Sequence, residues 1–164
     1  MIITPDDLPK IREKHKNQKI VFCSGVFDLT HAGHVLFFED CKKHGEILVV
    51  VLGKDRNVKD YKGDKHPIMN EHIRLKMVDS LKPVDYALLD TYDAPKEDPA
   101  FLINKFLFDL KPDVYIVNKD AFNLSYREEM AKKYNTKLIV LERYCPEEFD
   151  DISTTKLIEK IKSL

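Results

Sequence analysis

The stretch GVFDLTHAGH, residues 25–34, follows the apolar run IVFC of residues 20–23 and leads into VLFFEDC, residues 35–41. That order predicts a strand, a turn and a helix. The two histidines, His31 and His34, are three residues apart, so both side chains are expected on one face of the first helical turn. A helix start offers unbonded backbone N–H groups and a partial positive charge, and both favour an anion. The stretch therefore predicts a phosphate site at a strand-to-helix turn.

The rest of the chain alternates apolar runs with helical patterns. The unbroken aliphatic run at residues 47–52 is typical of a strand buried on both faces of a sheet. Residues 54–66 are polar and lysine-rich, so they predict a loop. The expected strands are residues 20–24, 47–52, 86–89, 114–117 and 138–141. The expected helices are residues 8–16, 31–44, 71–82, 100–110, 126–134 and 154–161.

Strands that alternate with helices predict an α/β fold with a parallel sheet covered on both faces. We expect one Rossmann-like, doubly wound domain over residues 1–164, with five parallel strands in the order 3-2-1-4-5 and a helical extension at residues 1–18. Ligands of such sheets bind beyond the carboxyl ends of the strands. GVFDLTHAGH lies at the carboxyl end of the first strand, so a binding site is expected there.

The composition limits the classes of function. Hydrophobic residues make up 43% and charged residues 34% of the 164 residues, which is typical of a globular protein. The formal net charge is −1, from 27 basic and 28 acidic residues, so the protein as a whole is not attracted to nucleic acid or to anionic membranes. No apolar run approaches the ~20 residues that span a bilayer. We therefore expect neither a nucleic-acid partner nor membrane insertion.

The three cysteines, Cys23, Cys41 and Cys145, are odd in number and lack CxxC spacing. Reduced thiols in a cytoplasmic protein are the simplest interpretation. Residues 1–18 are polar and lack the apolar core of a signal peptide, which agrees with a cytoplasmic location.

The histidine pair has two other interpretations, a helix cap beside an ordinary surface histidine and a metal site. A metal site would need a third ligand, and Asp28 is the only obvious candidate in the sequence. Because the pair accompanies Gly25 and Gly33 at a strand-to-helix turn, we favour phosphate binding and predict no metal site built from protein side chains.

GVFDLTHAGH resembles the nucleotide-binding signature of the cytidylyltransferase-like nucleotidyltransferases. That superfamily pairs a GxFDxxHxGH-type element with a second element of the form ISTTK, and this chain has ISTTK at residues 152–156. Lys62-Gly63 and Arg74 match the family between the two elements. The resemblance covers the chain from about Leu8 to its end.

The resemblance implies transfer of a nucleoside monophosphate from CTP or ATP to a small phosphorylated sugar or polyol, with release of pyrophosphate. The acceptor phosphate attacks the α-phosphorus directly, so no covalent enzyme intermediate is expected. Positioning and stabilisation of charge on the phosphoryl oxygens then carry catalysis. The resemblance also implies Mg²⁺ bound with the triphosphate and a homodimer.

The resemblance assigns roles to individual residues. His31, His34 and Lys62 are the catalytic residues, with His34 closest to the α-phosphate and Lys62 reaching over the phosphates. Lys59 and Lys65 are rivals of Lys62 in the same segment. The nucleotide-binding positions are Gly25, Val26, Phe27, Gly33, Arg74, Asn118, Asp120, Ser153, Thr154 and Thr155, and the acceptor-binding positions are Asp28 and Asp55.

Several of these roles have a structural alternative. Arg74 can form a surface ion pair, which contributes little to stability. Ser153 can cap the last helix, with or without a phosphate bound there. Asp28 can brace the turn in which it lies.

The chain departs from the family after the fourth expected strand, where relatives carry a glycine-containing segment. Here the sequence is Asn118-Lys119-Asp120, and Asn and Lys resist backbone geometry that glycine permits. This departure affects recognition of the base. The segment before ISTTK, residues 143–151, is also longer and more acidic than in some relatives, although Arg143 remains within reach of a nucleotide.

The motifs leave several branches open. The expected helix before the first strand and the pair Lys62-Gly63 are similar to heptose-phosphate adenylyltransferases. ISTTK is closer to glycerol-3-phosphate cytidylyltransferases, and residues 54–85 resemble archaeal FAD synthetases. A non-catalytic nucleotide-binding module is the alternative of a different class. The intact histidine and ISTTK elements argue for the enzyme.

Overall fold

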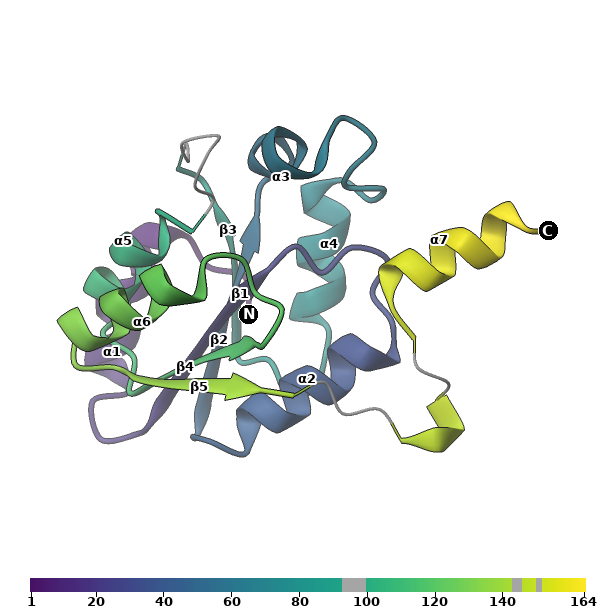
Figure 1. The fold of residues 1–164 in the computed structure, drawn as a ribbon. Coiled ribbons are helices and arrows are strands. Elements are labelled where there is room, and N and C mark those ends of the chain that lie inside the picture. Colours follow the sequence, from purple (N-terminus) through teal and green to yellow (C-terminus); the bar gives the residue numbers. More distant parts are fainter. Residues whose placement is uncertain (93–99, 143–145, 150–151) are drawn as a thin grey trace.

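The computed structural model describes residues 1–92, 100–142, 146–149 and 152–164. Five strands form one parallel sheet in the order β3-β2-β1-β4-β5 (Figure 1). This confirms the α/β class and the strand order that the sequence predicts. The strands are β1 (Ile20–Gly25), β2 (Ile47–Gly53), β3 (Tyr86–Asp90), β4 (Val114–Asn118) and β5 (Lys137–Leu141).

Helices cover both faces of the sheet. Successive side chains of a strand point to opposite faces, so a continuous apolar strand has apolar side chains to bury on both. In β1, Ile20 and Phe22 belong to one core, and Val21 and Cys23 belong to the other. Both faces are therefore buried, as the aliphatic runs predict. The first core includes residues of α1 (Leu8–Lys14), α5 (Ile103–Leu110) and α6 (Leu124–Lys133), and the second includes residues of α2 (Ala32–Lys42) and α4 (Glu71–Asp79).

The lysine-rich segment after β2 forms a helix over most of its length, so the prediction of a loop at residues 54–66 is wrong there. This helix, α3 (Asp55–Lys62), has one buried apolar side chain, Val58. The buried side-chain amide of Asn57 donates to a carboxylate oxygen of Asp90 and to the carbonyl of Tyr92. These tertiary contacts stabilise a helix that its local sequence alone would not.

The helices α2 and α4 end earlier than the sequence predicts. α2 ends at Lys42, so Gly45 does not form its C-cap. Instead, Gly45 allows the chain after α2 to lie close to the backbone of Lys19, since a Cβ at residue 45 would lie 2.6 Å from the Lys19 carbonyl oxygen. α4 ends at Asp79, before the expected stop at Pro83.

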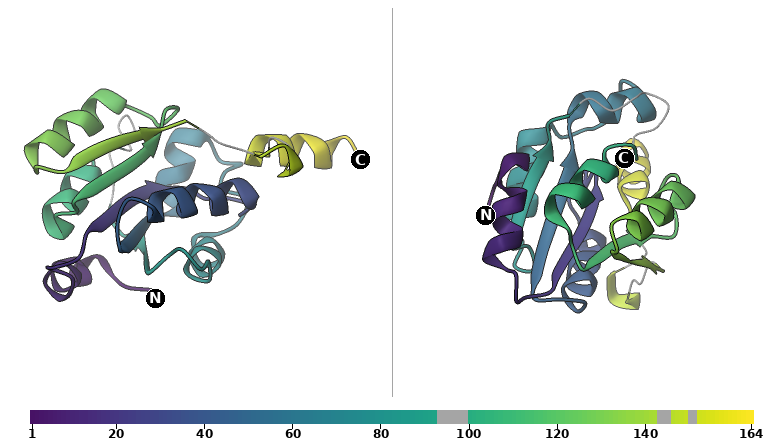
Figure 2. Two further views of the ribbon diagram at one scale, coloured as in Figure 1. Left: turned by 90° about the horizontal axis from the view of Figure 1, so that it is seen from below. Right: turned by 90° about the vertical axis from the view of Figure 1, so that its left-hand side faces the viewer.

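The two ends of the chain lie apart from the sheet centre. Ile2 forms a parallel bridge with Ala87 of β3, and a 3-10 helix, η1 (Pro5–Asp7), leads into α1. At the other end, α7 (Thr154–Lys162) extends away from the sheet, and none of its residues is fully buried (Figure 2). In the described ranges, no helix is long and apolar enough to cross a membrane.

Two of the cysteines lie in the core between the sheet and α2. Cys23 and Cys41 are fully buried, and burial raises the pKa of the Cys23 thiol well above its usual value. We expect neither thiol to react with Ellman's reagent in the folded protein, whereas both should react after denaturation. The measurement uses a Cys145→Ser variant, because Cys145 lies outside the described residues. Rapid reaction of one thiol in the folded variant would contradict the buried placement.

Candidate active site

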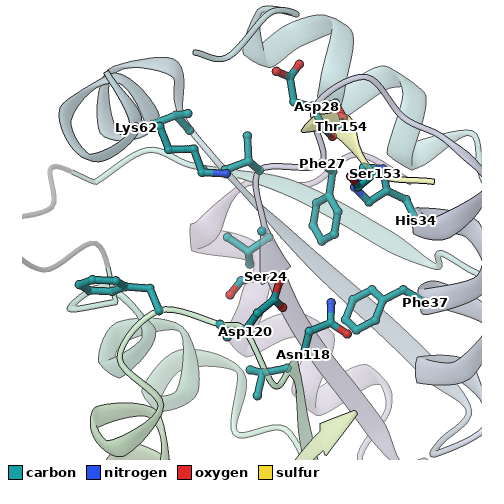
Figure 3. A pocket seen from close by; sticks show the side chains of 18 of the residues that line it. Ser24, Phe27, Asp28, His34, Phe37, Lys62, Asn118, Asp120, Ser153 and Thr154 are labelled. Atoms are coloured by element: carbon teal, nitrogen blue, oxygen red, sulfur yellow. Dashed lines mark hydrogen bonds between the residues drawn. The ribbon is translucent and has the colours of Figure 1, made fainter. Parts of the chain in front are cut away.

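A cavity of about 800 Å³ lies at the carboxyl ends of the strands (Figure 3). Residues from the ends of all five strands line it, among them Gly25, Gly53, Asp90, Asn118 and Leu141. This is the edge of the sheet at which ligands of such folds bind. The predicted site residues that line the cavity are Gly25, Val26, Phe27, Asp28, His31, Gly33, His34, Lys62, Asn118, Asp120, Ser153, Thr154 and Thr155.

The histidine pair caps the start of α2. The backbone N–H of Gly33 donates to Nδ1 of His31 at 3.1 Å, and the backbone N–H of His31 donates to Nδ1 of His34 at 3.4 Å. The two rings stack with their centroids 3.9 Å apart. Because each Nδ1 accepts a hydrogen bond, this network assigns the proton of each neutral ring to Nε2. Both rings of the pair are therefore hydrogen-bond donors at Nε2 in the wall of the cavity.

The loop between β1 and α2 is held in an unusual conformation. Phe27 and Leu29 have φ values of 52° and 46°, in the left-handed region that side chains rarely adopt. The Phe27 ring packs edge-on against His34, with the centroids 5.5 Å apart. A Cβ at Gly25 would lie 2.8 Å from the Phe27 ring, so glycine is required for this packing. Strain of this kind is typical of functional sites.

The ISTTK element meets the histidine loop. Ser153 caps α7 by accepting from the backbone N–H of Lys156, and the Thr154 hydroxyl donates to the carbonyl of Asp28 at 2.9 Å. A Cβ at Gly33 would lie 3.3 Å from the Ile152 carbonyl oxygen, so glycine lets the two elements approach. The N-termini of α2 and α7 therefore both contribute to the cavity, and helix N-termini favour anions.

The carboxylates of the predicted acceptor residues, Asp28 and Asp55, both have partners within the protein. Asp28 is buried, and its carboxylate accepts backbone N–H groups of Leu29, Ile68 and Met69. Asp55 does not line the cavity and pairs with Arg74 at 2.8 Å. In this structure, both carboxylates brace the loops around the site.

Arg74 likewise does not line the cavity, although the resemblance predicts that it binds the nucleotide. Its side chain is fully buried, which also excludes the surface ion pair considered above. The guanidinium donates to the carbonyls of Val26, Gly53 and Met69, and to the carboxylate of Asp55. One side chain therefore ties the loops that follow β1 and β2 to the start of α4.

The three candidate lysines, Lys59, Lys62 and Lys65, differ in their position relative to the cavity. Lys62, at the end of α3, lines the cavity, and Figure 3 shows its amine directed toward the middle of the cavity. Lys59 and Lys65 are exposed and do not line it.

The segment Asn118-Lys119-Asp120 follows β4 without the glycine that the family resemblance implies there. None of these residues has a positive φ, so the replacement of glycine introduces no backbone strain there. Asn118 and Asp120 line the cavity, in keeping with their predicted place. Arg143, which was expected within reach of the nucleotide, lies outside the described residues.

The cavity also includes residues that the sequence patterns did not single out. Ser24, Tyr61, Phe122 and Arg127 line it. Partial burial raises the pKa of Tyr61 to about 12, against the opposing effect of the positive charges of Arg127 and Arg74. Each of these four lies outside the motifs, so no spacing signal identified them.

No cluster of three His, Cys, Asp or Glu side chains suited to a metal ion exists among the described residues. Asp28, the third ligand considered for the histidine pair, already accepts three backbone N–H groups.

Comparison with known proteins supports the family resemblance. A family model described as Cytidylyltransferase-like matches residues 22–160. The bifunctional protein HldE of Helicobacter pylori (strain P12) is 36% identical over 156 residues, covering 94% of this chain and 30% of its own length. The chain therefore spans less than a third of that relative. FAD synthase of Aciduliprofundum boonei is 39% identical over 144 residues, covering 86% of this chain and 89% of its own length.

Solved structures share the fold. A lipopolysaccharide core biosynthesis protein from Thermoplasma volcanium aligns with a TM-score of 0.62 and 27% identity, covering 79% of this chain and 98% of that chain. Pantoate-beta-alanine ligase from Francisella tularensis aligns with a TM-score of 0.64 and 18% identity, covering 100% of this chain and 78% of that chain. The second match concerns the fold alone.

Proposed function

Because the chain belongs to the cytidylyltransferase-like family, we propose that it is a nucleotidyltransferase that joins a nucleoside monophosphate from CTP or ATP to a small phosphorylated acceptor. The observation that carries this proposal is the histidine pair at the start of α2. Its two Nδ1 atoms accept backbone N–H groups, which assigns the Nε2 atoms of both neutral rings as donors. Such donors suit phosphate oxygens.

The groups around the cavity fit direct transfer. An oxygen of the acceptor phosphate bonds to the α-phosphorus while the bond from that phosphorus to the pyrophosphate leaving group breaks. His34 stabilises charge at the α-phosphate, and His31 binds the phosphate chain beside it. The N-terminus of α7 and the amine of Lys62 add positive charge around the leaving group.

Mg²⁺ is the cofactor that triphosphate chemistry requires, and it would enter with the nucleotide. Mg²⁺ commonly keeps several waters and binds through substrate phosphates with one or two carboxylates. Asp120 is a carboxylate in the cavity wall that suits this role, whereas the carboxylates of Asp28 and Asp90 already accept hydrogen bonds at both oxygens. When bound, Mg²⁺ neutralises charge on the triphosphate.

Two acceptor classes deserve testing. A phosphorylated sugar or polyol, such as heptose phosphate or glycerol 3-phosphate, is our first candidate on the sequence motifs. FMN is the second, because a relative named FAD synthase aligns over 89% of its own length. FAD consists of FMN joined to AMP, so that acceptor would go with ATP.

The experiment is a pyrophosphate-release assay. CTP, ATP, GTP and UTP are first ranked by thermal shift, and the best are incubated with glycerol 3-phosphate, heptose 1-phosphate or FMN in the presence of Mg²⁺. Release that depends on one acceptor supports the proposal. Nucleotide binding without release across the panel would favour the non-catalytic module.

Lys62→Ala is expected to lower turnover by about tenfold or more, because the variant loses a positive charge near the developing phosphate charge. The melting temperature should hardly change, since the side chain lies at the end of a surface helix. Lys59→Ala and Lys65→Ala are matched controls in the same segment, and their turnover should stay within about twofold of the unmodified protein. A larger loss in either control would move the role to that lysine.

A further inference from the structure

Arg127 is a cationic side chain in the cavity wall that no motif includes. It lies in α6, and its Nε donates to the Phe122 carbonyl at 2.7 Å. Its Nη1 donates to the hydroxyl of Tyr115, a fully buried residue of β4. Two hydrogen bonds, one of them to a fully buried tyrosine, hold the plane of the guanidinium, so little conformational entropy would be lost when it binds a ligand.

The charge of Arg127 has no counter-ion in the described part of the chain, where its guanidinium forms no ion pair. Its Nη2 donates no hydrogen bond to any described residue. Two of the acidic residues that line the same cavity have other partners, since Glu142 pairs with Lys119 and Asp90 accepts from Asn57. A guanidinium with unused donors in a cavity wall suits an oxyanion ligand.

Arg127 and the histidine pair lie on opposite sides of the sheet edge. His31 and His34 belong to the start of α2, whose buried residues pack in the core shared with α4. Arg127 comes from α6 and contacts Tyr115, and both α6 and Tyr115 pack in the core shared with α1 and α5. The cavity therefore has two anion-binding walls, one on each side of the end of β1.

A nucleotidyl transfer brings two anions into one cavity, the triphosphate and the acceptor phosphate. The histidine pair and the N-terminus of α7 form one wall, which suits the longer triphosphate. We propose that Arg127 binds the phosphate of the acceptor and is a specificity-determining residue for phosphorylated acceptors. This inference rests on the proposed function. Tyr61, whose phenol stays protonated with a pKa of about 12, is a further donor in the same cavity.

The test compares steady-state kinetics of Arg127→Gln, Arg127→Lys and Lys132→Gln, the last being an exposed lysine on the same helix. Arg127→Gln should raise the KM of the acceptor about tenfold or more, the loss expected for a charge-assisted hydrogen bond. The KM of the nucleotide should stay within about threefold. Arg127→Lys should recover part of the affinity, and Lys132→Gln should match the unmodified protein.

A purely structural role gives a different result. If Arg127 only anchors the loop at Phe122, Arg127→Gln should raise the KM values of both substrates together and lower the melting temperature. That outcome would overturn the inference. Absence of turnover in the unmodified protein with every pair of substrates would instead count against the proposed function.

A binding measurement tests the inference without turnover. The triphosphate wall is filled with an αβ-methylene analogue of ATP or CTP, and inorganic phosphate is then titrated by calorimetry. Arg127→Gln should weaken this phosphate binding about tenfold, whereas Lys132→Gln should not. Equal phosphate affinity in Arg127→Gln and the unmodified protein would overturn the inference.

Discussion

His34→Ala is expected to lower kcat by about 10²-fold or more, as loss of a preorganised charge-stabilising donor does in other enzymes. The ring of His34 is fixed by its stacking on His31, by its contact with Phe27 and by the backbone N–H that it accepts. Its Nε2 donor is therefore in place before substrate binds. The measurement is steady-state pyrophosphate release at saturating nucleotide and acceptor.

The control is His72→Ala, an exposed histidine near the start of α4, which should leave kcat unchanged. His34→Ala also removes one capping contact of α2, so its melting temperature should fall slightly, by the equivalent of about 1 kcal/mol. A near-normal kcat in a folded His34→Ala protein would remove this residue from the chemistry.

Arg74→Met should destabilise the folded protein by about 3–5 kcal/mol, the cost of breaking a buried ion pair from one side. The variant leaves the carboxylate of Asp55 and the carbonyls of Val26, Gly53 and Met69 without their donor. The free energy of unfolding is measured by urea denaturation. Arg74→Lys should be nearly as unstable, because an ammonium cannot reproduce the planar fork.

Arg56→Met provides the matched control, since Arg56 is an exposed arginine of the neighbouring helix α3. Its free energy of unfolding should stay within about 0.5 kcal/mol of the unmodified protein. An Arg74→Met protein of unchanged stability, with only a raised KM for the nucleotide, would return Arg74 to the phosphate-binding role that the family resemblance implies.

The sheet could be predicted because its signal is local. A continuous aliphatic run such as residues 47–52 is typical of a strand buried between two layers of helices, and short strands alternating with helices imply parallel pairing. α3 could not be predicted in this way. Its stability comes from Val58 and Asn57 contacting the sheet edge, and the sequence around them is that of a loop.

The same distinction holds for the site. The histidine loop and ISTTK could be predicted because each is a compact motif at the end of an element. Arg74 and Arg127 have ordinary surroundings in the sequence, yet one is fully buried and the other lines the cavity. Their roles depend on where α4 and α6 pack, and residue spacing in the sequence does not predict these packing positions.

The most direct test of direct nucleotidyl transfer follows the α-phosphorus. The protein is incubated with nucleotide labelled at the α-phosphate, Mg²⁺ and the acceptor that gave pyrophosphate release. Direct transfer predicts that label appears in the acceptor product in a one-to-one ratio with pyrophosphate, and that none stays bound to denatured protein. Label retained covalently on the protein, or label released as free nucleoside monophosphate without acceptor product, would contradict it.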